Sequence, residues 1–210
     1  FLIAGFVKGV IGLGLPTVSL ALLAATIGLK PAMAILVLPS LLTNVWQGLY
    51  GNALKELILR MWAFLGAAFI CTWIGAGILS NTNPALLSVL LGMLLVGYAV
   101  ISLSTPQIYI PPRWEALAAP VIGSLSGIFT GLTGSFVVPG VMYLQALNLP
   151  RDKFIQAMGI TFTMATISLG VSLGGHGLMS KSFLYLSVFA LAPTFFGMLI
   201  GIAVRKSIND

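Results

Sequence analysis

Lys8 is the one charged side chain that lies well inside an apolar stretch of this sequence. An ammonium group in apolar surroundings is costly and needs a partner. The acidic residues, however, all fall in or next to predicted loops: Glu56, Glu115, Asp152 and Asp210. Two interpretations therefore stay open. Either the missing counter-ion is a bound anion, or the side chain extends along its helix to reach water.

Two glycine-rich motifs share the same gaps between glycines, and each ends in a proline: GFVKGVIGLGLP at 5–16 and GIFTGLTGSFVVP at 127–139. Glycines at this density break a helix and allow close approach of two backbones. We predict an interrupted, ligand-facing helix at each motif, broken at these glycines: Gly12, Gly14, Gly131 and Gly134. For Gly5 and Gly127, tight helix packing is the favoured interpretation.

After each break the sequence predicts that a helix restarts. In the first motif it restarts at Gly14 or Leu15, before Pro16, and in the second Ser135 is the expected N-cap, before Pro139. The first turn of a helix has free N–H groups and carries the positive end of the helix dipole. Two such ends facing each other would bind a small anion without any charged side chain.

Polar residues in the apolar runs that follow the motifs complete the candidate site. They either line a cavity or form hydrogen bonds between helices. The full set of candidate substrate-binding residues is Lys8, Gly12, Gly14, Pro16, Asn44, Gln47, Thr130, Gly131, Gly134, Ser135, Pro139, Thr161 and Thr163. His176, in the sequence GGHG, is interpreted as a loop residue rather than a proton relay.

Several kinds of chemistry are excluded by the residues that the sequence lacks. With one histidine and one cysteine, Cys71, it contains no catalytic triad, no disulfide and no metal-binding cluster. It also has no phosphate-binding loop. We therefore expect no catalytic residue, no metal and no cofactor.

The composition is that of an integral membrane protein. Of 210 residues, 59% are hydrophobic and 7% are charged, and the mean hydropathy is +1.09, whereas soluble domains have about 25% charged residues. The apolar runs last about 20 residues and do not alternate, which predicts helices rather than a barrel. The net charge of +6 is scattered between these runs, which favours the lipid bilayer over nucleic acid as a partner.

The apolar runs define the elements that must position these residues. In the first half they cover 1–27 with a break at 12–16, 32–50, 61–79 and 85–103. After a linker at 105–114 they cover 115–149, 157–174 and 183–204. Shifts of 122 and 123 residues superimpose the two halves, which predicts one repeat at 1–104 and a second at 115–210. We expect the second repeat to lack its last helix, and the chain to begin partway through a helix.

The charges between the runs predict how the two repeats are oriented. If each glycine motif enters and returns as a re-entrant hairpin, seven loop Lys and Arg residues fall on one side and two, Lys30 and Lys181, on the other. The positive-inside rule requires such a bias. The predicted fold is an all-α integral membrane protein of two inverted repeats, each a broken or re-entrant hairpin plus about three transmembrane helices. The two hairpin tips are expected to meet at mid-membrane.

Four segments together resemble the sulfite exporter TauE/SafE family of membrane permeases: GFVKGVIGLGLPTVSLALL, GIFTGLTGSFVVPGVMYL, LKPAMAILVLPSLL and LPRDKFIQAMGITFTMA. The resemblance implies a duplicated helical bundle in the bacterial inner membrane. It also implies transport of small sulfur-containing or organic anions such as sulfite, sulfoacetate or sulfonates. The family motif often has a GxGGG core, which here reads GLGLP and GLTGSF, so only these glycines carry over: Gly12, Gly14, Gly131 and Gly134.

A secondary transporter that works by rocking of two inverted halves is the first functional hypothesis. Two alternatives stay open, a membrane accessory or assembly subunit without transport of its own, and a passive anion channel. The chain is predicted not to be an enzyme. A small anion and the lipid bilayer are the expected partners, and a homo-oligomer is left open.

Overall fold

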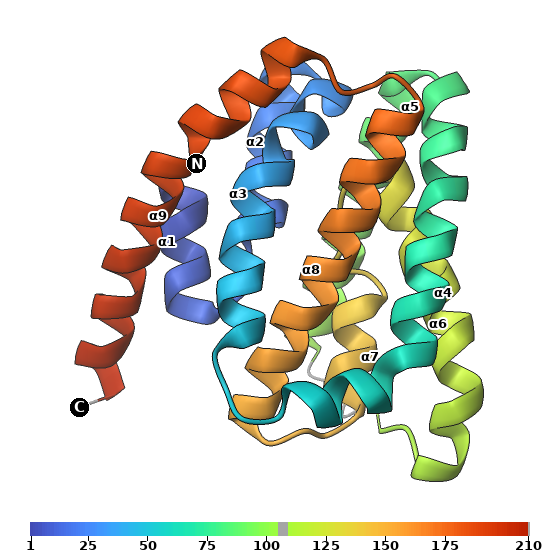
Figure 1. Ribbon diagram of the computed structural model, residues 1–210, viewed down its shortest axis with the longest axis vertical. Coiled ribbons are helices and arrows are strands. Elements are labelled where there is room, and N and C mark those ends of the chain that lie inside the picture. Colours follow the sequence, from blue (N-terminus) through green and yellow to red (C-terminus); the bar gives the residue numbers. More distant parts are fainter. Residues whose placement is uncertain (105–108, 210) are drawn as a thin grey trace.

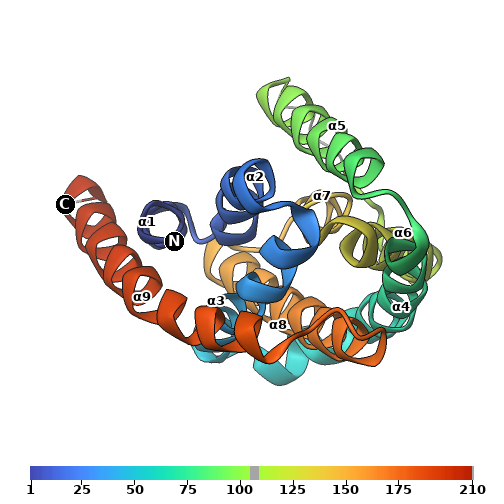
Figure 2. The same cartoon turned by 90° about the horizontal axis from the view of Figure 1, so that it is seen from above.

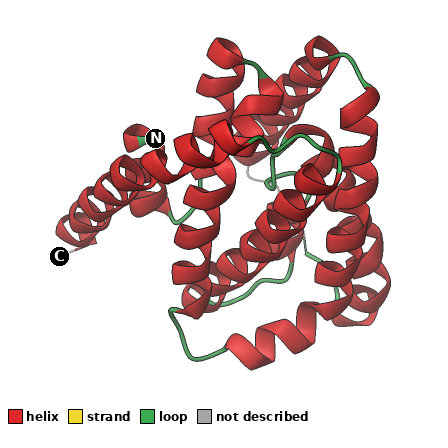
Figure 3. Ribbon diagram, turned by 45° about the horizontal axis from the view of Figure 1, so that its top comes forward, coloured by secondary structure: helices red, strands yellow, loops and turns green. Residues whose placement is uncertain are grey.

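The structure is a computed structural model that describes residues 1–104 and 109–209. Every regular element in these two ranges is a helix (Figures 1 and 3). The helices are α1 (Leu2–Ile11), α2 (Leu15–Ile27), α3 (Leu29–Leu49), α4 (Leu54–Asn81), α5 (Pro84–Leu103), α6 (Pro112–Thr133), α7 (Gly140–Ala146), α8 (Arg151–Gly175) and α9 (Lys181–Asn209).

Six of these helices are long and apolar enough to cross a membrane, namely α3, α4, α5, α6, α8 and residues Lys181–Arg205 of α9. The helices α1 and α2 are apolar but shorter, and α7 has only 7 residues. The prediction of a multi-pass, all-helical membrane protein is therefore confirmed.

Both predicted helix breaks are present, and both begin in the same way. Gly12 ends α1 with φ 86°, and its N–H donates to the carbonyl of Lys8. Gly134 ends α6 with φ 72°, and its N–H donates to the carbonyl of Thr130. A left-handed backbone at the end of a helix favours glycine, which has no Cβ to clash. The glycines of the two motifs therefore set where these helices stop.

The chain restarts differently after the two breaks. In the first motif Gly14 is the N-cap of α2 and Pro16 lies in its first turn, as predicted. In the second, Ser135 is not an N-cap, because α7 begins only at Gly140, directly after Pro139. A helix capped by Ser135 would place this proline where its missing N–H and its ring disrupt the first hydrogen bond. The prediction for Ser135 was therefore wrong.

Two helices begin more than one turn earlier than predicted, α4 at Leu54 and α8 at Arg151. Their first two turns carry charged residues that pair with other helices. Lys153 Nζ lies 2.7 Å from Glu56 Oε1 and joins α8 to α4. The guanidinium of Arg60 donates two 2.8 Å hydrogen bonds to the carboxylate of Glu115 and joins α4 to α6. These two ion pairs link the polar N-terminal turns to neighbouring helices.

The helices pack as three pairs, and α3 and α8 form the central one. Viewed from above, α3 and α8 lie between α1 and α9 on one side and α4 and α6 on the other (Figure 2). The helix α5 stands at the edge and is mostly exposed. Gly48 contacts Gly159 at one end of this pair, and Val37 contacts Gly170 at the other, which shows that α3 and α8 are antiparallel.

Glycines allow the two helices within each outer pair, α1 with α9 and α4 with α6, to touch through their backbones. A Cβ added at Gly5 or Gly9 would strike the carbonyl oxygens of α9, and one at Gly127 would strike that of Ala68 in α4. Gly131 packs in the same way against the backbone of Thr72. The tight-packing interpretation of this spacing therefore holds for Gly5 and Gly127, and Gly131 also belongs to a helix interface.

Charged residues gather at one end of the bundle. The N-termini of α4, α6 and α8 meet at the lower end in Figure 1, with these cations: Lys55, Arg60, Arg113, Arg151 and Lys153. The helix α9 runs to the same end and carries Arg205. At the opposite end Lys30 Nζ donates to the carbonyl of Ser80 over 3.4 Å, and Lys181 begins α9. We call the lower end the basic end.

Candidate functional site

A cavity of about 320 Å³ lies beside the first helix break, between α1, α3 and α9. We call it the Lys8 cavity. Its residues are Lys8, Gly9, Gly12, Thr43, Trp46, Gln47, Tyr50, Ile155, Met198, Leu199, Ile202 and Arg205. Three of these were predicted site residues: Lys8, Gly12 and Gln47. On α3 the spacing of Thr43, Gln47 and Tyr50 places all three on one helix face.

Lys8 is buried, with 3% of its surface exposed, although its side chain ends in an ionisable amine. Its Nζ donates a hydrogen bond to Oδ1 of Asn44, a neutral group. Neither of the two ion pairs that join the described residues includes Lys8. The Lys8 amine at the cavity wall therefore has no carboxylate partner in the described chain.

A chain of hydrogen bonds holds Asn44 in place. Its Nδ2 donates to Oγ1 of Thr166 over 3.3 Å, and Thr166 Oγ1 donates to the carbonyl of Phe162 over 2.6 Å. Because the Asn44 amide nitrogen donates to Thr166 of α8, the amide oxygen faces Lys8 and accepts its hydrogen bond. Thr166, which was not among the predicted site residues, thus positions Asn44 and connects the two halves of the sequence.

A second set of amides closes the α3–α8 contact toward the basic end. Gln47 Nε2 donates to the carbonyl of Ile155 over 2.9 Å. Gln156 accepts from the N–H of Ala53 and donates to the carbonyl of Gly48, both over 3.1 Å. Sequence reasoning missed Gln156, because the apolar run was taken to start at residue 157. Its burial among backbone groups gives it a structural role.

The remaining candidates lie around the second break or between helices. Thr130 Oγ1 donates to the carbonyl of Ser126 over 2.7 Å. The hydroxyls of Ser135 and Thr161 are buried without a hydrogen-bond partner. Gly14 and Pro16 are buried at the start of α2. None of these candidates lines the Lys8 cavity.

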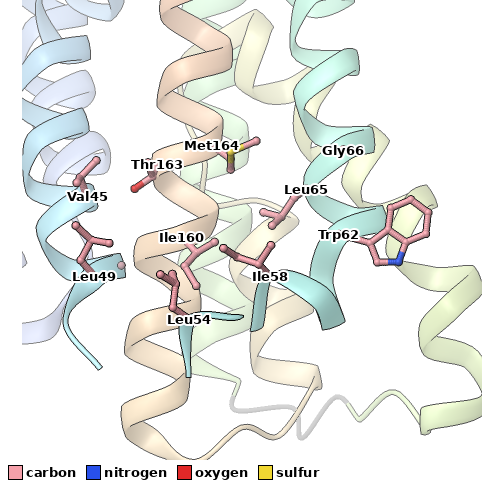
Figure 4. Close-up of a pocket in the computed structure, with 11 residues that line it drawn as sticks. Val45, Leu49, Leu54, Ile58, Trp62, Leu65, Gly66, Ile160, Thr163 and Met164 are labelled. Atoms are coloured by element: carbon pink, nitrogen blue, oxygen red, sulfur yellow. The ribbon is translucent and has the colours of Figure 1, made fainter. Parts of the chain in front are cut away.

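Thr163 lines a different cavity, of about 380 Å³, between α3, α4 and α8. Figure 4 shows the apolar side chains that line this cavity, among them Leu49, Ile58 and Ile160. The Thr163 hydroxyl donates to the carbonyl of Gly159 over 2.7 Å, within its own helix. No charged side chain reaches this space among the residues that line it, so it offers an anion no counter-charge.

The two helix breaks approach each other through side chains rather than through their glycines. A Cβ at Gly12 would lie 3.9 Å from Gln47 and from Met158, whereas one at Gly134 would lie 2.7 Å from Met33. Met33 and Gln47 are far apart on α3, at about 1.5 Å of rise per residue. The glycines therefore sit at different heights, which differs from the expectation that the tips meet.

Phe136 connects the second break to the first. Its ring packs against Phe162 with 6.0 Å between ring centroids. Phe162 lies one turn along α8 from Met158, the residue nearest to Gly12. Both breaks therefore contact the same stretch of α8, one through Met158 and the other through Phe136.

The site holds functional groups for binding a charged solute. Over residues 1–104 and 109–209, no three His, Cys, Asp or Glu side chains gather into a metal-binding group. What the Lys8 cavity offers is a buried cation and amide donors beside apolar walls.

Comparison with families of known proteins identifies a match over the whole sequence. Residues 1–210 match the family model described as sulfite exporter TauE/SafE. No curated protein and no solved structure matches the chain.

Proposed function

Because the chain belongs to the sulfite exporter TauE/SafE family, whose members are transporters and not enzymes, we propose that it is a secondary transporter for a small anion. The cargo is a sulfur-containing or organic anion such as sulfite, sulfoacetate or a sulfonate. It binds in the Lys8 cavity, and the membrane is the bacterial inner membrane.

The burial of the Lys8 amine without a carboxylate partner is the observation that carries this proposal. An ammonium group that is 3% exposed and bonded only to a neutral amide loses most of its hydration without gaining a counter-charge. A bound anion supplies that counter-charge. Charge-assisted hydrogen bonds to a sulfonate or sulfite oxygen are also stronger than the one to Asn44.

The neighbours of Lys8 suit a small anion with an organic part. The Gln47 amide uses one of its N–H donors on Ile155, which leaves the second for the anion. The opposite wall consists of apolar α9 side chains such as Met198 and Ile202. These surround the carbon part of an organic anion, while Lys8 holds its charged end.

An inverted-repeat architecture is supported by contacts that recur in the two halves. Gly9 of α1 packs against the backbones of Met198 and Gly201 in α9. Gly131 of α6, which lies 122 positions after Gly9, packs in the same way against α4. It contacts the backbones of Thr72 and Gly75, which lie 126 positions before Met198 and Gly201. The offset of 126 between α4 and α9 is larger than the offset of 122 between α1 and α6. The second half therefore has about one helix turn of additional chain before α9.

The direction of the helices supports inversion as well. Counterparts α3 and α8 run antiparallel, and each hairpin helix is paired with the long helix of the other half. The basic end carries most of the cations, and the positive-inside rule assigns such an end to the cytoplasm. Since the Lys8 cavity includes Tyr50 and Arg205 near that end, the anion enters or leaves it on the cytoplasmic side.

Flux into proteoliposomes tests the function. Purified protein is reconstituted, and uptake of labelled sulfite or sulfoacetate is followed with and without the same anion inside. A secondary transporter gives saturable uptake that is accelerated by internal substrate. A passive channel gives neither saturation nor counterflow, and an accessory subunit gives no flux above empty vesicles.

A matched pair of variants tests the site. Gly12→Leu places a side chain in the Lys8 cavity, and Gly177→Leu puts leucine at another positive φ, 68° against 86°, in open space away from the cavity. We expect Gly12→Leu to abolish flux and Gly177→Leu to retain it, with folding of both checked by size-exclusion chromatography. Equal flux in the two variants would contradict this site.

A further inference from the structure

We infer that the apolar cavity lined by Thr163 binds one acyl chain of an anionic phospholipid from the leaflet at the basic end, and that Lys55 binds the phosphate of its headgroup. This cavity is the space of about 380 Å³ between α3, α4 and α8, and we call it the Thr163 cavity. The site depends only on the membrane setting of the helices and not on the cargo of the Lys8 cavity.

The Thr163 cavity lies in the half of the bundle nearer the basic end. It is lined by the last residue of α3, Leu49, and by the first residue of α4, Leu54. In Figure 1 the first turns of α4 cross the lower end of the bundle, and the helix then turns upward. Ile58 of these first turns and Gly66 further along the helix both line the cavity. The cavity therefore begins where α4 enters the bundle, at the level of one leaflet.

The walls of this cavity suit a hydrocarbon chain rather than water. The one hydroxyl among them, that of Thr163, donates to the carbonyl of Gly159 in its own helix. Leu49 and Ile58 are 63% and 41% exposed, so the cavity opens on the outer surface of the helices, which faces lipid. Water in an apolar hollow has no polar partners, and an empty hollow loses dispersion contacts. A lipid acyl chain fills the space and restores those contacts.

Lys55 supplies a cation beside this cavity. Ile58 and Trp62 follow Lys55 by three and seven positions, so the three residues share one face of α4. Lys55 is exposed, and neither ion pair of the residues that the structure describes includes it. Its neighbour Glu56 is already paired with Lys153 and does not neutralise it. The phosphate of an anionic lipid is the counter-charge that a membrane supplies at this level.

A second apolar cavity between α4 and α8 shows what Lys55 adds. It has about 310 Å³, and Phe69, Trp73 and Ser168 are among the residues that line it. From Met61 to Asn81 the sequence of α4 contains no charged residue. A lipid chain in that second cavity therefore finds no cation of α4 for its headgroup. Of these two cavities, the Thr163 cavity is the one that selects among headgroups.

A lipid suits the Thr163 cavity better than a second copy of the chain does. In one membrane a two-fold pair of copies through this face would bring their basic ends together. Lys55, Arg113 and Arg151 carry positive charge at that end, and the ion pairs found within residues 1–104 and 109–209 include none of them. Such charges repel each other, whereas an anionic headgroup offsets them.

Native mass spectrometry of the purified chain in detergent tests the headgroup contact. Phosphatidylglycerol and phosphatidylcholine with identical acyl chains are titrated, and binding of the first lipid is measured. We expect phosphatidylglycerol to bind about fivefold more tightly, and Lys55→Gln to bring the two affinities to within about twofold. Arg113→Gln removes a cation at the same end, on a helix that contributes no residue to the cavity, and should keep the preference. An equal preference in Lys55→Gln and in the unaltered protein would overturn this role of Lys55.

A matched pair of glycine variants tests the cavity itself. Gly66 lines it, and an added Cβ there meets no atom within 4 Å, so Gly66→Leu fills the space without a backbone clash. Gly92 of α5 has equally free surroundings outside the cavity, which makes Gly92→Leu the control. We expect Gly66→Leu to weaken binding of the first phosphatidylglycerol about tenfold or more and Gly92→Leu to leave it unchanged. Undiminished binding in Gly66→Leu would overturn the site, and a dimer lost only in Gly66→Leu would assign the cavity to a second copy instead.

Discussion

Replacing Lys8 by methionine removes the charge while keeping much of the side-chain volume. Two unit charges about 4 Å apart interact by about 4 kcal/mol at an effective dielectric constant near 20, and by about 1 kcal/mol in water. Lys8 is 3% exposed, but the cavity beside it opens past Tyr50. The interaction therefore lies toward the upper part of that interval. At 1.36 kcal/mol per tenfold change, the loss in anion affinity is about 100- to 1,000-fold.

This loss translates into a measurable difference in stability. An anion at about 100 times its Kd stabilises the folded protein by about 2.7 kcal/mol. In Lys8→Met the same concentration is at most about equal to the new Kd, so the stabilisation falls below about 0.5 kcal/mol. Unfolding of the detergent-solubilised protein with and without sulfite or sulfoacetate measures both values.

Two controls separate charge from packing. Lys30→Met removes a cation at the opposite end of the bundle and should keep the full stabilisation by the anion. Lys8→Arg keeps the charge and should keep most of the stabilisation by the anion. If Lys8→Met retained full stabilisation by an anion that stabilises the unaltered protein, the assignment of the counter-ion role to Lys8 would be refuted.

The remaining predictions concern packing, positioning and surface charge. Gly127→Ala would drive a Cβ into the backbone of α4 and should lower the unfolding free energy by about 2 kcal/mol or more, whereas Gly66→Ala, with no atom within 4 Å, should cost nothing measurable in the same chemical unfolding. Thr166→Val should weaken anion binding about tenfold because Asn44 loses its orienting partner, and Thr166→Ser should restore it; equal affinities in an isothermal titration would contradict this role. Glu115→Gln should lower stability by no more than about 1 kcal/mol, since its partner Arg60 is 36% exposed, and high salt should shrink the difference.

The helix breaks were predictable because their cause is local. Gly12 and Gly134 end their helices in a left-handed conformation that other residues avoid, and this requirement is visible in the sequence itself. The early starts of α4 and α8 were not predictable in this way. Their first turns are polar and contact residues distant in the sequence, such as Lys153 with Glu56, which are 97 positions apart.

The candidate site was predicted in part for the same reason. Lys8 and Gln47 stood out as polar residues in apolar runs, and both line the cavity. The α9 wall, including Met198 and Ile202, was missed because an apolar side chain in a membrane helix carries no local sign of what it faces. Gly131 was taken for part of a break, but its spacing relative to Gly127 fits a helix interface equally well until the partner helix is known.

The pairing of α1 with α9 has a consequence for biogenesis. Gly5 meets its backbone neighbour at Thr194, so almost the whole chain is synthesised between the two. At about 5–20 residues per second, the ribosome takes roughly 10–40 s to supply α9. During that interval the glycine face of α1 lies in the lipid without α9 packed against it. Separately expressed halves should therefore be unstable alone and recover only when produced together.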